Sequence, residues 1–305
     1  MNKLQAMEVF VQVVDAGGFT RAAENMQLPK ATVSTLVQQL ELTLAVKLLH
    51  RTTRQVSVTS DGAAYYERCL RILSDVREAE ESLSTNRASP SGRLRVDVSA
   101  GIANEVLIPA LPSFFDRYPN IRLDLGCGDR QVDLIEEGVD CAIRGGTLPD
   151  SALIARRVGV LNFVTCATPG YLDKHGRPRH PHDLQRHKCI NYFSSKTGKT
   201  FEWDFVRGDE TIMVATPACL AINDGNVYAT AGLHGLGIMQ MASFQVESLI
   251  ASGRLEAVLQ DWTSSPLPIN VVYPQNRHLS AKVRVFVEWV AELFMTHPDL
   301  QLKKD

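Results

Sequence analysis

Apolar residues near the N-terminus recur at helical spacing, and a proline divides the pattern in two. The first group, at i, i+3, i+4 and i+7, is Phe19, Ala22, Ala23 and Met26. This spacing predicts a short helix that begins after Thr20 and buries one face. Pro29 lacks an amide hydrogen and restricts the residue before it, so the helix cannot continue past it. A second helix is therefore expected to start near Lys30 in a new direction.

The second helix has an apolar inner face and a small, polar outer face. Its predicted buried stripe is Val33, Leu36, Val37, Leu40 and Leu44. Its opposite face carries Lys30, Ala31, Ser34, Thr35 and Gln38. An upstream packing helix is indicated by Leu4, Met7, Val11 and Val14. Two helices joined by so tight a turn indicate either a helix-turn-helix, whose second helix enters the major groove of DNA, or an ordinary αα-hairpin.

The segment that follows favours the DNA-binding alternative. In "LLHRTTRQVSVTSDG", Val56 and Val58 alternate with polar residues, which predicts a β-wing beside the helix pair. The basic residues between positions 21 and 54 outnumber the acidic Glu24 and Glu41 and are Arg21, Lys30, Lys47, Arg51 and Arg54. This local patch matters because the net charge of the chain is -2, which gives no general attraction to nucleic acid. Its Lys and Arg side chains would neutralise phosphates, while the outer face of the second helix would meet base edges.

A long helix and a linker are predicted next. Thr59 is suited to an N-cap, and helical spacing runs from about Ser60 to Thr85. One side of this helix carries Tyr66, Leu70, Leu73, Val76 and Leu83. Such a stripe needs a partner, which is a second subunit, the N-terminal helices, or both. The turn-forming residues of "NRASPSG", at positions 86–92, then predict a domain boundary.

The rest of the chain alternates strands and helices. "GRLRVDVSA" and "IRLDLGCG" have strand-like alternation and flank a helix in "NEVLIPALPSFFDRYP", which predicts a βαβ unit. A helix in "VDLIEEG" and a strand in "VDCAIRGG" would extend it into a parallel sheet covered by helices. After Val160 a second lobe is indicated by "LNFVTCAT", "CINYF", "FEWDF", "TIMVAT", "CLAIND" and "GNVYATAGLHGLGIM". A last strand in "LPINVVYP" and the amphipathic helix after it would return to the first lobe.

Two N-terminal stretches, "AAENMQLPKATVSTLVQQLE" and "LLHRTTRQVSVTSDGAAYY", resemble the winged helix-turn-helix of the LysR-type transcriptional regulators, particularly their CrgA-like branch. The chain from Ser91 onward resembles the effector-binding domain of that family, which is similar to a periplasmic binding protein. The chain departs from the family pattern at Thr35, where arginine is usual, and at Ala45, where glycine is usual. Ala45 stands at a helix C-terminal position that favours positive φ, so a different or slightly strained turn is expected there.

The predicted fold class is therefore α/β with an N-terminal winged helix-turn-helix, a long linker helix and a two-lobed periplasmic-binding-protein-like effector domain. The winged helix-turn-helix is assigned to residues 1–59, and the linker or dimerisation helix with its hinge to residues 60–90. The effector-binding domain takes residues 91–305, with lobe I at 91–160 and 269–305 and lobe II at 161–268. The resemblance implies that linker helices of two subunits pair and space two recognition helices on DNA.

Candidate site residues form two groups. Those expected to contact DNA are Arg21, Lys30, Ala31, Thr32, Ser34, Thr35, Gln38, Arg51 and Arg54. Those expected to bind an effector mostly follow strand ends, where α/β sheets bind ligands, and are Ser99, Ala100, Gly101, Gly128, Asp129, Arg130, Arg144, Gly145, Phe193, Ser194, Asn223, Asp224 and Gly237. Ser99 and Gly101 would offer backbone amides to an anion. Arg144 would clamp a carboxylate, unless it pairs with Asp129, Asp140 or another local acid.

Other chemistries have weaker support. The histidines of "KHGRPRHPHDLQRHKC" match no metal-site spacing, so neither a metal nor another cofactor is expected. The glycines of "GLHGLG" lack the order of a dinucleotide loop and no catalytic motif occurs, so an enzyme is not expected. A solute-binding protein would need export, but Glu8 and Asp15 interrupt the apolar run that a signal peptide keeps uncharged. No window is apolar enough for a membrane span, and the six scattered cysteines are typical of free thiols.

These observations together predict a cytoplasmic, sequence-specific transcriptional regulator of the LysR type that recognises an interrupted palindrome in double-stranded DNA. A small-molecule effector, anionic or aromatic, is expected between the two lobes. The resemblance implies a homodimer, tetramer or larger homo-oligomer. It also implies that effector binding changes the subunit arrangement and so alters transcription by RNA polymerase.

Overall fold

The computed structural model describes residues 2–51, 56–83, 90–130, 132–146, 153–275 and 279–301, without the side chains of residues 51 and 77–83. The chain divides into two compact units, Met1–Ala88 and Ser89–Asp305. The finer boundaries given above stay predictions. Within the described ranges, no helix is both long and apolar enough to cross a membrane.

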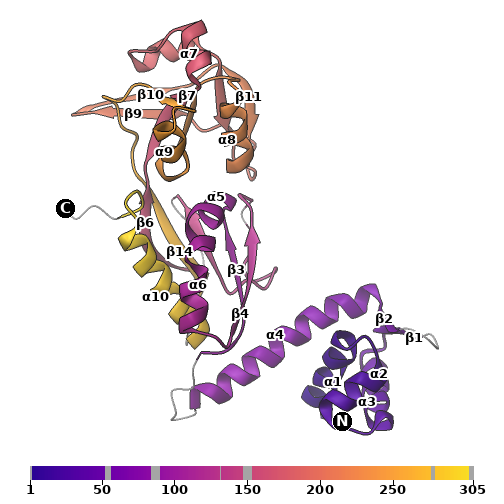
Figure 1. Cartoon of the computed structure of the whole chain (residues 1–305). Helices are drawn as coiled ribbons and strands as arrows, with labels where there is room; N and C mark the ends of the chain where they lie inside the picture. Colours follow the sequence, from indigo (N-terminus) through magenta and orange to yellow (C-terminus); the bar gives the residue numbers. More distant parts are fainter. Residues whose placement is uncertain are drawn as a thin grey trace. The chain divides into compact units, whose positions relative to one another are not determined.

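The first unit begins with three helices and a two-stranded wing (Figure 1). These elements are α1 (Lys3–Asp15), α2 (Phe19–Met26), α3 (Lys30–Leu44), β1 (Leu49–Arg51) and β2 (Val56–Val58). The helices α2 and α3 confirm the predicted helix-turn-helix, and the antiparallel pairing of β1 with β2 confirms the predicted wing. The expectation that α2 begins after Thr20 is wrong. The amide of Ala22 donates to the carbonyl oxygen of Gly18 at 3.1 Å, so the helical ladder starts two residues earlier.

The long helix α4 (Ser60–Leu83) packs on the core of the same unit. Thr59 caps it as predicted, because its Oγ1 accepts a hydrogen bond from the Gly62 amide at 2.8 Å. Cys69 and Leu73 are buried against the N-terminal helices, which are thus one partner of the apolar stripe. A Cβ on Gly62 would lie 1.9 Å from the carbonyl oxygen of Leu48. The close approach of α4 to the start of the wing therefore requires glycine.

Lobe I is built on a five-stranded sheet in the order β4-β3-β5-β14-β6 (Figure 1). The strands are β3 (Gly92–Val98), β4 (Ile121–Cys127), β5 (Cys141–Gly145), β6 (Leu153–Leu161) and β14 (Leu267–Pro274). β3 runs parallel to β4 and β5, which confirms the predicted βαβ unit. The expectation of a parallel sheet is wrong for the other half, because the returning strand β14 inserts antiparallel between β5 and β6.

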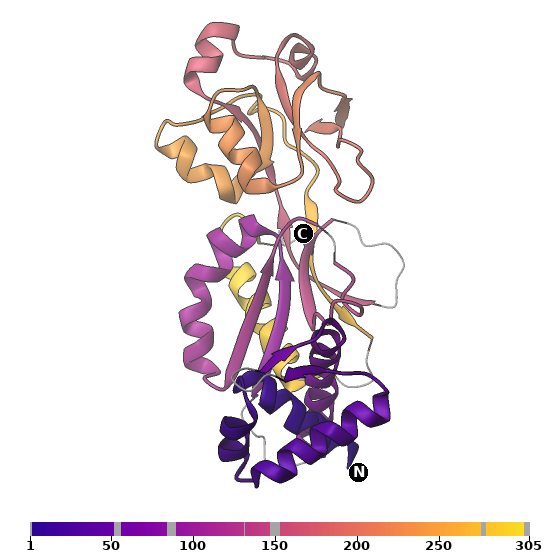
Figure 2. The same ribbon diagram turned by 90° about the vertical axis from the view of Figure 1, so that its right-hand side faces the viewer.

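Helices cover one face of this sheet (Figures 1 and 2). The connection from β3 to β4 is helical throughout and consists of α5 (Ala100–Ile102), the π-helical turn η1 (Ala103–Leu107) and α6 (Ile108–Arg117). Phe114 of α6 packs against Phe286 and Trp289 of α10 (Ala281–Thr296), with ring centroids 5.6 and 5.0 Å apart. As predicted, the last helix thus returns to the core of lobe I.

The segment "VDLIEEG", at positions 132–138, is a turn and not the predicted helix. Asp133 Oδ1 accepts hydrogen bonds from the amides of Ile135 and Glu136, both at 2.9 Å, and so caps a single turn. Gly138 then leaves the turn at φ 65°, a conformation that ends helices. Leu134 still packs against β5 and β14, on the face of the sheet opposite α6 and α10. The apolar Leu134 is therefore buried although the predicted helix does not form.

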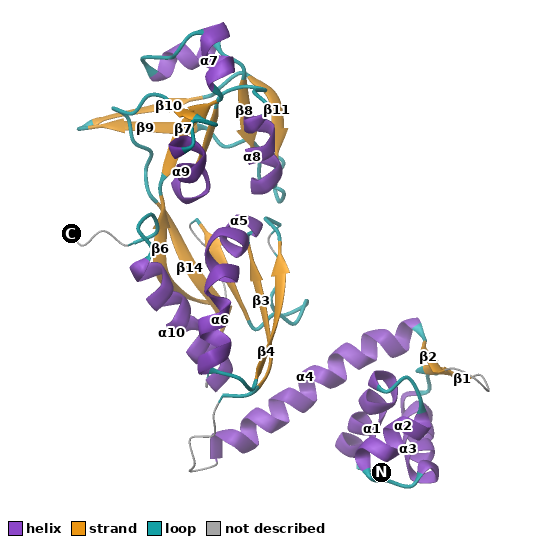
Figure 3. Ribbon diagram, in the orientation of Figure 1, coloured by secondary structure: helices purple, strands orange, loops and turns teal. Residues whose placement is uncertain are grey.

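Lobe II consists of short strands and helices (Figure 3). Its strands are β7 (Phe163–Ala167), β8 (Cys189–Tyr192), β9 (Trp203–Arg207), β10 (Glu210–Val214), β11 (Ala218–Ile222), β12 (Met239–Ala242) and β13 (Glu256–Ala257). Its helices are α7 (Pro169–His175), the 3₁₀ turn η2 (Pro181–Arg186), α8 (Gly225–Leu233) and α9 (Ser243–Ala251). β8 and β11 run parallel, and α8 directly follows β11. The carboxyl ends of β8 and β11 therefore lie next to the start of α8.

Candidate DNA-binding surface and effector site

The outer face of α3 presents the residues that were predicted to read DNA. The exposed ones are Lys30, Ala31, Thr32, Thr35 and Gln38, whereas Ser34 is half-buried. On the inner face, Val33, Val37 and Leu40 are fully buried in the core formed with α1 and α2. Because packing fixes the inner face, the exposed side chains project from one rigid helix. This is the arrangement that a recognition helix requires.

The basic residues around α3 lie on three different elements. Arg21 is exposed on α2, and Lys30 is exposed at the first position of α3. Arg51 ends β1, where its backbone pairs with Val56 of β2, so the wing carries it as predicted. Arg54 lies outside the described residues, and its role stays a prediction.

Glu41 ties α3 to the wing, a role that sequence reasoning missed. Its side chain is 2% exposed, and Oε1 accepts hydrogen bonds from the amides of Leu48 at 3.0 Å and Leu49 at 3.2 Å. Oε2 lies 3.1 Å from Nζ of Lys47. Burial opposes ionisation, but the Leu48 amide, Lys47 and the Leu49 amide together lower the pKa of Glu41. Helical spacing could have predicted the burial of Glu41, because Glu41 follows Val37 by four residues and therefore lies on the buried stripe of the helix.

The turn between α3 and the wing contains the strained residue that was expected. Ala45 adopts a left-handed conformation with φ 54° and ψ 29°, which favours glycine. Its amide donates to the carbonyl oxygen of Leu42, and the amide of Val46 donates to that of Glu41, each at 3.2 Å. This pattern closes the helix and directs the next residues towards the Glu41 carboxylate.

The two lobes meet at Asp129, one of the predicted effector residues. This residue follows β4 in lobe I, and its Oδ2 accepts hydrogen bonds from the Tyr192 hydroxyl at 2.8 Å and the Gly225 amide at 2.7 Å, both in lobe II. The Tyr192 hydroxyl also lies 3.0 Å from the carbonyl oxygen of Asn223. Burial and the Asp129 carboxylate raise the pKa of Tyr192, so the hydroxyl stays protonated and donates. Tyr192 and Gly225 were missed, although each directly adjoins a predicted residue.

A second contact between the lobes lies at Gly101. A Cβ placed there would be 2.3 Å from Nε2 of Gln245, a residue of α9. Gln245 Nε2 would also lie 3.9 Å from a Cβ at Gly225. Gly101 is buried, and its lack of a side chain lets α5 approach both α8 and α9. Sequence reasoning missed Gln245 because α9 itself was not predicted.

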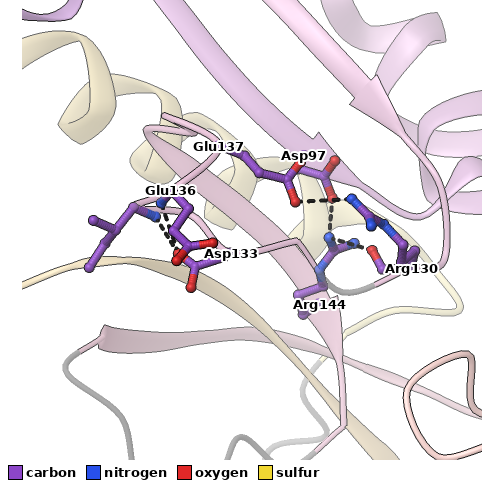
Figure 4. Close-up of polar contacts among 7 residues, drawn as sticks. Asp97, Arg130, Asp133, Glu136, Glu137 and Arg144 are labelled. Atoms are coloured by element: carbon purple, nitrogen blue, oxygen red, sulfur yellow. Dashed lines mark hydrogen bonds and ion pairs between the residues drawn. The ribbon is translucent and has the colours of Figure 1, made fainter. Parts of the chain in front are cut away.

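Arg144 is engaged within lobe I, so the second of the two alternatives given for it is the one observed (Figure 4). Its guanidinium pairs with Asp97, a buried acid that the sequence analysis did not name. The same guanidinium donates to the carbonyl oxygens of Gly128 at 3.3 Å and Arg130 at 3.2 Å. These two carbonyls flank Asp129. Arg144 therefore positions the Asp129 loop and is not available as the predicted carboxylate clamp.

Other predicted effector residues lie at the lobe I strand ends or just before the lobe II helix. Ser99 occupies the N-cap of α5, and Asp224 caps α8 by accepting hydrogen bonds from the amides of Asn226 at 3.0 Å and Val227 at 2.9 Å. Further predicted residues, which follow or end strands and are half-buried or exposed, are Ala100, Gly128, Gly145, Phe193, Ser194 and Asn223. Arg130 pairs with Glu137 at 3.0 Å and is largely exposed.

Gly237 lies apart from this group, so the structure does not bring it together with the other predicted effector residues. It is buried, and a Cβ there would lie 2.5 Å from the carbonyl oxygen of Lys188, just before β8. The adjacent Ile238 bridges to Cys189, the first residue of β8. Gly237 is thus at the opposite end of β8 from Tyr192, and its role is close backbone packing.

A cavity of about 330 Å³ lies elsewhere in lobe II. It is lined by residues of β7, α9 and the segment 257–263, and by none of the predicted effector residues. The histidine-rich segment forms contacts of its own, since Tyr171 stacks on His175 at 4.6 Å. Within the described ranges, no group of three or more His, Cys, Asp or Glu side chains is placed to hold a metal ion.

A winged helix-turn-helix in one unit and a two-lobed α/β domain in the other define a transcriptional regulator with DNA-binding and effector-binding parts. Family comparison agrees with this class. Residues 4–63 match the bacterial regulatory helix-turn-helix of the lysR family, and residues 87–295 match the LysR substrate binding domain. The chain belongs to the LysR family of transcriptional regulators. Members of this family bind DNA and small-molecule effectors, form oligomers and are not enzymes.

Individual relatives span nearly the whole chain. An HTH-type transcriptional repressor of Pseudomonas aeruginosa (strain UCBPP-PA14) is 43% identical over 302 residues, covering 99% of this chain and 95% of the relative. The regulator CrgA of Neisseria meningitidis serogroup C is 36% identical over 289 residues, covering 94% and 96%. The solved structure of CrgA from N. meningitidis matches with a TM-score of 0.60 at 35% identity, covering 94% and 97%. That of the Vibrio cholerae virulence activator AphB matches with a TM-score of 0.58 at 28% identity, covering 95% and 98%.

Proposed function

We propose that this LysR-type protein is a cytoplasmic regulator that binds an interrupted palindrome as a homodimer, tetramer or larger homo-oligomer. In this proposal α3 enters the major groove and the wing holds phosphate through Arg51 and Arg54. A small anionic or aromatic effector binds between the lobes and changes the arrangement of the subunits, which alters transcription by RNA polymerase. The observation that carries the DNA-binding part is the exposed polar face of α3 above a fully buried inner face.

The chemistry of the exposed side chains supports two kinds of DNA contact. Arg21 and Lys30 carry positive charge, which binds phosphate whatever the base sequence. Gln38 offers both a donor and an acceptor, as bidentate readout of adenine requires, and Thr35 offers a hydroxyl and a methyl group. Thr35 stands where the family usually has arginine, so base readout at that position is expected to differ from that of relatives that keep the arginine.

The effector part of the proposal rests on the strand ends where the two lobes meet. Asp129 contacts lobe II there, and Phe193 and Ser194 are half-buried beside Tyr192. An aromatic ring at Phe193 and the backbone amides at Ser99 suit a ligand with an apolar body and a polar end. Arg144 supports this region through the loop that it holds and does not contact the ligand in the proposal.

Self-association is supported by an apolar residue on α4. Ile72 is 40% exposed, although Cys69 and Leu73 on the same helix are buried in the core. A second copy of α4 packing along this side would cover Ile72, as the linker helices of a dimer do. Pairing of this kind would also set the spacing between two copies of α3 and hence the spacing of the half-sites.

Selection of bound duplexes from a random DNA library, with the full chain at near-physiological salt, tests the proposal. We expect enrichment of an interrupted palindrome. The variant Gln38→Ala should lose about 1–3 kcal/mol of binding free energy for the enriched site, corresponding to about 5–150-fold in affinity, with little change on random DNA. Gln39→Ala is the matched control, because Gln39 is exposed on the same helix but lies outside the predicted reading face.

Two results would contradict the assignment. Recovery of unenriched DNA would show that α3 does not read bases in this form of the protein. Equal losses for Gln38→Ala and Gln39→Ala would show that the predicted reading face is misplaced. A uniform loss for Arg21→Ala on all sequences, with a weaker salt dependence, is the expected signature of a phosphate contact.

A further inference from the structure

Asp129 forms a contact between the two lobes, and hydrogen bonds from Arg144 fix the loop that carries it. The residue lies after β4 in lobe I, while both of its donors, the Tyr192 hydroxyl and the Gly225 amide, belong to lobe II. Both donors act on the same oxygen, Oδ2, at 2.8 and 2.7 Å. Hydrogen bonds to an ionised carboxylate are stronger than neutral ones, so this single oxygen joins the lobes firmly.

One of the two donors on the lobe II side lies at the positive end of a helix dipole. Gly225 is the first residue of α8, and its amide is one of the four that a helix leaves without an internal partner. Asp224 already satisfies the amides of Asn226 and Val227 through Oδ1. Asp129 satisfies the Gly225 amide and adds a second negative charge at the positive end of the helix. The N-terminus of α8 is therefore capped by one carboxylate from each lobe.

The lobe I side of the contact is held in place by an ion pair. Arg144 donates to the carbonyl oxygens of Gly128 and Arg130, on both sides of Asp129, and is itself paired with the buried Asp97. Figure 4 shows the Arg144 side chain between Asp97 and the backbone of Arg130. The side chains of Arg144 and Asp97 are only 11% and 12% exposed, so the support is rigid. Asp129 is thus presented to lobe II in a fixed position.

We infer that Asp129 is a latch between the lobes, fixed to lobe I through Arg144 and released from α8 when the lobes move apart. The regulatory meaning of this inference rests on the proposed function, in which an effector that binds between the lobes changes the arrangement of the subunits. Any rotation of lobe II that withdraws β8 and α8 from lobe I breaks both hydrogen bonds together, because both donors belong to lobe II. The latch therefore favours two discrete arrangements of the lobes over a continuous range. Gly101, which lets Gln245 approach α5, forms a second contact between the lobes near Gly225. In this inference that contact forms and breaks together with the latch.

Hydrogen–deuterium exchange of the full-length protein tests the latch directly. In Asp129→Ala we expect exchange of the first turn of α8 and of the α5 segment to rise at least about tenfold, because one broken contact frees both sides. The core strands β3 and β14 should keep their protection. Asp129→Asn should lie between the wild type and Asp129→Ala, since the amide oxygen still accepts from Gly225 but carries no charge.

The matched control is Asp133→Asn, which alters a carboxylate in the next turn of the same lobe. Asp133 caps its own turn through Ile135 and Glu136, so only the segment 133–139 should exchange faster in this variant. Unchanged exchange at α8 in Asp129→Ala would overturn the latch. A uniform rise across residues 89–305 would also overturn it, because Asp129 would then act on overall stability.

A DNA-selection experiment with Asp129→Ala separates this inference from the proposed function. If the variant still enriches the wild-type sequence while α8 exchange is unchanged, the latch fails and the regulator assignment stands. If α8 exchange rises as expected but neither protein enriches any sequence, the latch stands and the DNA-binding assignment fails. The two readouts come from different units of the chain.

Discussion

Glu41 in the first unit and Asp97 in the second are both buried carboxylates, yet their surroundings shift the two pKa values in opposite directions. Backbone amides of Leu48 and Leu49, with Lys47, lower the pKa of Glu41 despite its burial. Burial raises the pKa of Asp97, although the Arg144 guanidinium opposes this shift. At Glu41 the backbone amides and Lys47 together outweigh the effect of burial on the pKa, whereas at Asp97 the Arg144 guanidinium does not.

The physical reason is the hydration and conformational freedom that each hydrogen-bond partner loses when it binds the carboxylate. An amide at the start of a strand is already fixed in direction, so accepting from it costs little additional order or desolvation. The Arg144 guanidinium must itself leave water to reach Asp97, and this penalty offsets much of the attraction. Glu41 therefore stabilises a local junction, whereas the Asp97–Arg144 pair fixes the position of the loop that carries Asp129 without contributing much net stability.

The largest expected effect comes from removing one member of the second pair. Arg144→Ala leaves Asp97 buried without its counter-charge, and we expect the free energy of unfolding of the second unit to fall by about 3 kcal/mol. Denaturation followed by tryptophan fluorescence measures this unit alone, because Trp203, Trp262 and Trp289 all lie in it. Adding Asp97→Asn should restore part of the loss by removing the stranded charge.

Arg130→Ala is the control for Arg144→Ala. Arg130 also forms an ion pair in this loop region, with Glu137, but its side chain is 72% exposed. Pairs of this kind contribute about 0–1 kcal/mol, so the control should barely move the transition. Similar losses for the two variants would mean that burial of the pair does not set its importance.

A smaller effect is expected at Glu41. Glu41→Gln keeps an acceptor but removes the charge, and should cost the first unit about 1.5 kcal/mol at pH 7. Because folding lowers the pKa of Glu41 from its ordinary value of 4.5, the charged form stabilises the fold above about pH 4.5. That contribution is lost as the pH falls through the lowered pKa, so the difference between wild type and variant should shrink there. Hydrogen exchange in α3 and β1, corrected for intrinsic rates at each pH, measures it.

Lys47→Ala distinguishes the backbone amides from the counter-charge at this site. The Lys47 side chain is 78% exposed, so its ion pair with Glu41 is screened by water and should contribute at most about 0.5 kcal/mol. If Lys47→Ala lowered the free energy of unfolding as much as Glu41→Gln does, the contrast between Glu41 and Asp97 would be wrong. A counter-charge would then stabilise Glu41, just as Arg144 stabilises Asp97 in the second unit.

The same contrast separates what the sequence could predict from what it could not. The helix-turn-helix follows from contacts within one helix turn and from a single proline, so periodicity predicted α3 almost to the residue. Even Glu41 lies on a predictable stripe. Its donors at Leu48 and Leu49 are only seven and eight residues away, so the contact is nearly local.

The contacts around the predicted effector residues join residues that are far apart in the sequence, so no local pattern could predict them. Asp97 meets Arg144 across 47 positions, because β3 and β5 pair as neighbours in the sheet. Asp129 meets Tyr192 across 63 positions and Gly225 across 96. Strand ends predicted Asp129, Asn223 and Asp224 as neighbours of one site, but which of them would touch depended on the lobe arrangement. Gly237 was predicted with this group but lies apart from it, because a glycine in a loop has the same sequence signal whether it lines a site or packs against a strand.

The smallest expected effect concerns Ala45, the turn that brings the amides of Leu48 and Leu49 to Glu41. Its φ of 54° costs a residue with a Cβ about 1 kcal/mol, and glycine would remove this cost. Glycine also loses about 0.5 kcal/mol more entropy on folding, so Ala45→Gly should stabilise the first unit by about 0.5 kcal/mol. Exchange at Leu48 and Leu49 should slow about twofold, as this free energy implies.

Gln27→Gly provides the matched comparison, because Gln27 adopts φ 53° at the end of α2 and has no contact with the Glu41 junction among those described. Both variants should gain similar stability from relief of the same backbone strain. If the turn at Ala45 positions the backbone that binds Glu41, the stability gained in Ala45→Gly should depend on the Glu41 carboxylate. This gain should then be smaller in a Glu41→Gln background. The gain in Gln27→Gly should not change there. Equal, independent gains would show that strain at Ala45 is a local property of the helix end and does not influence how the buried carboxylate is held.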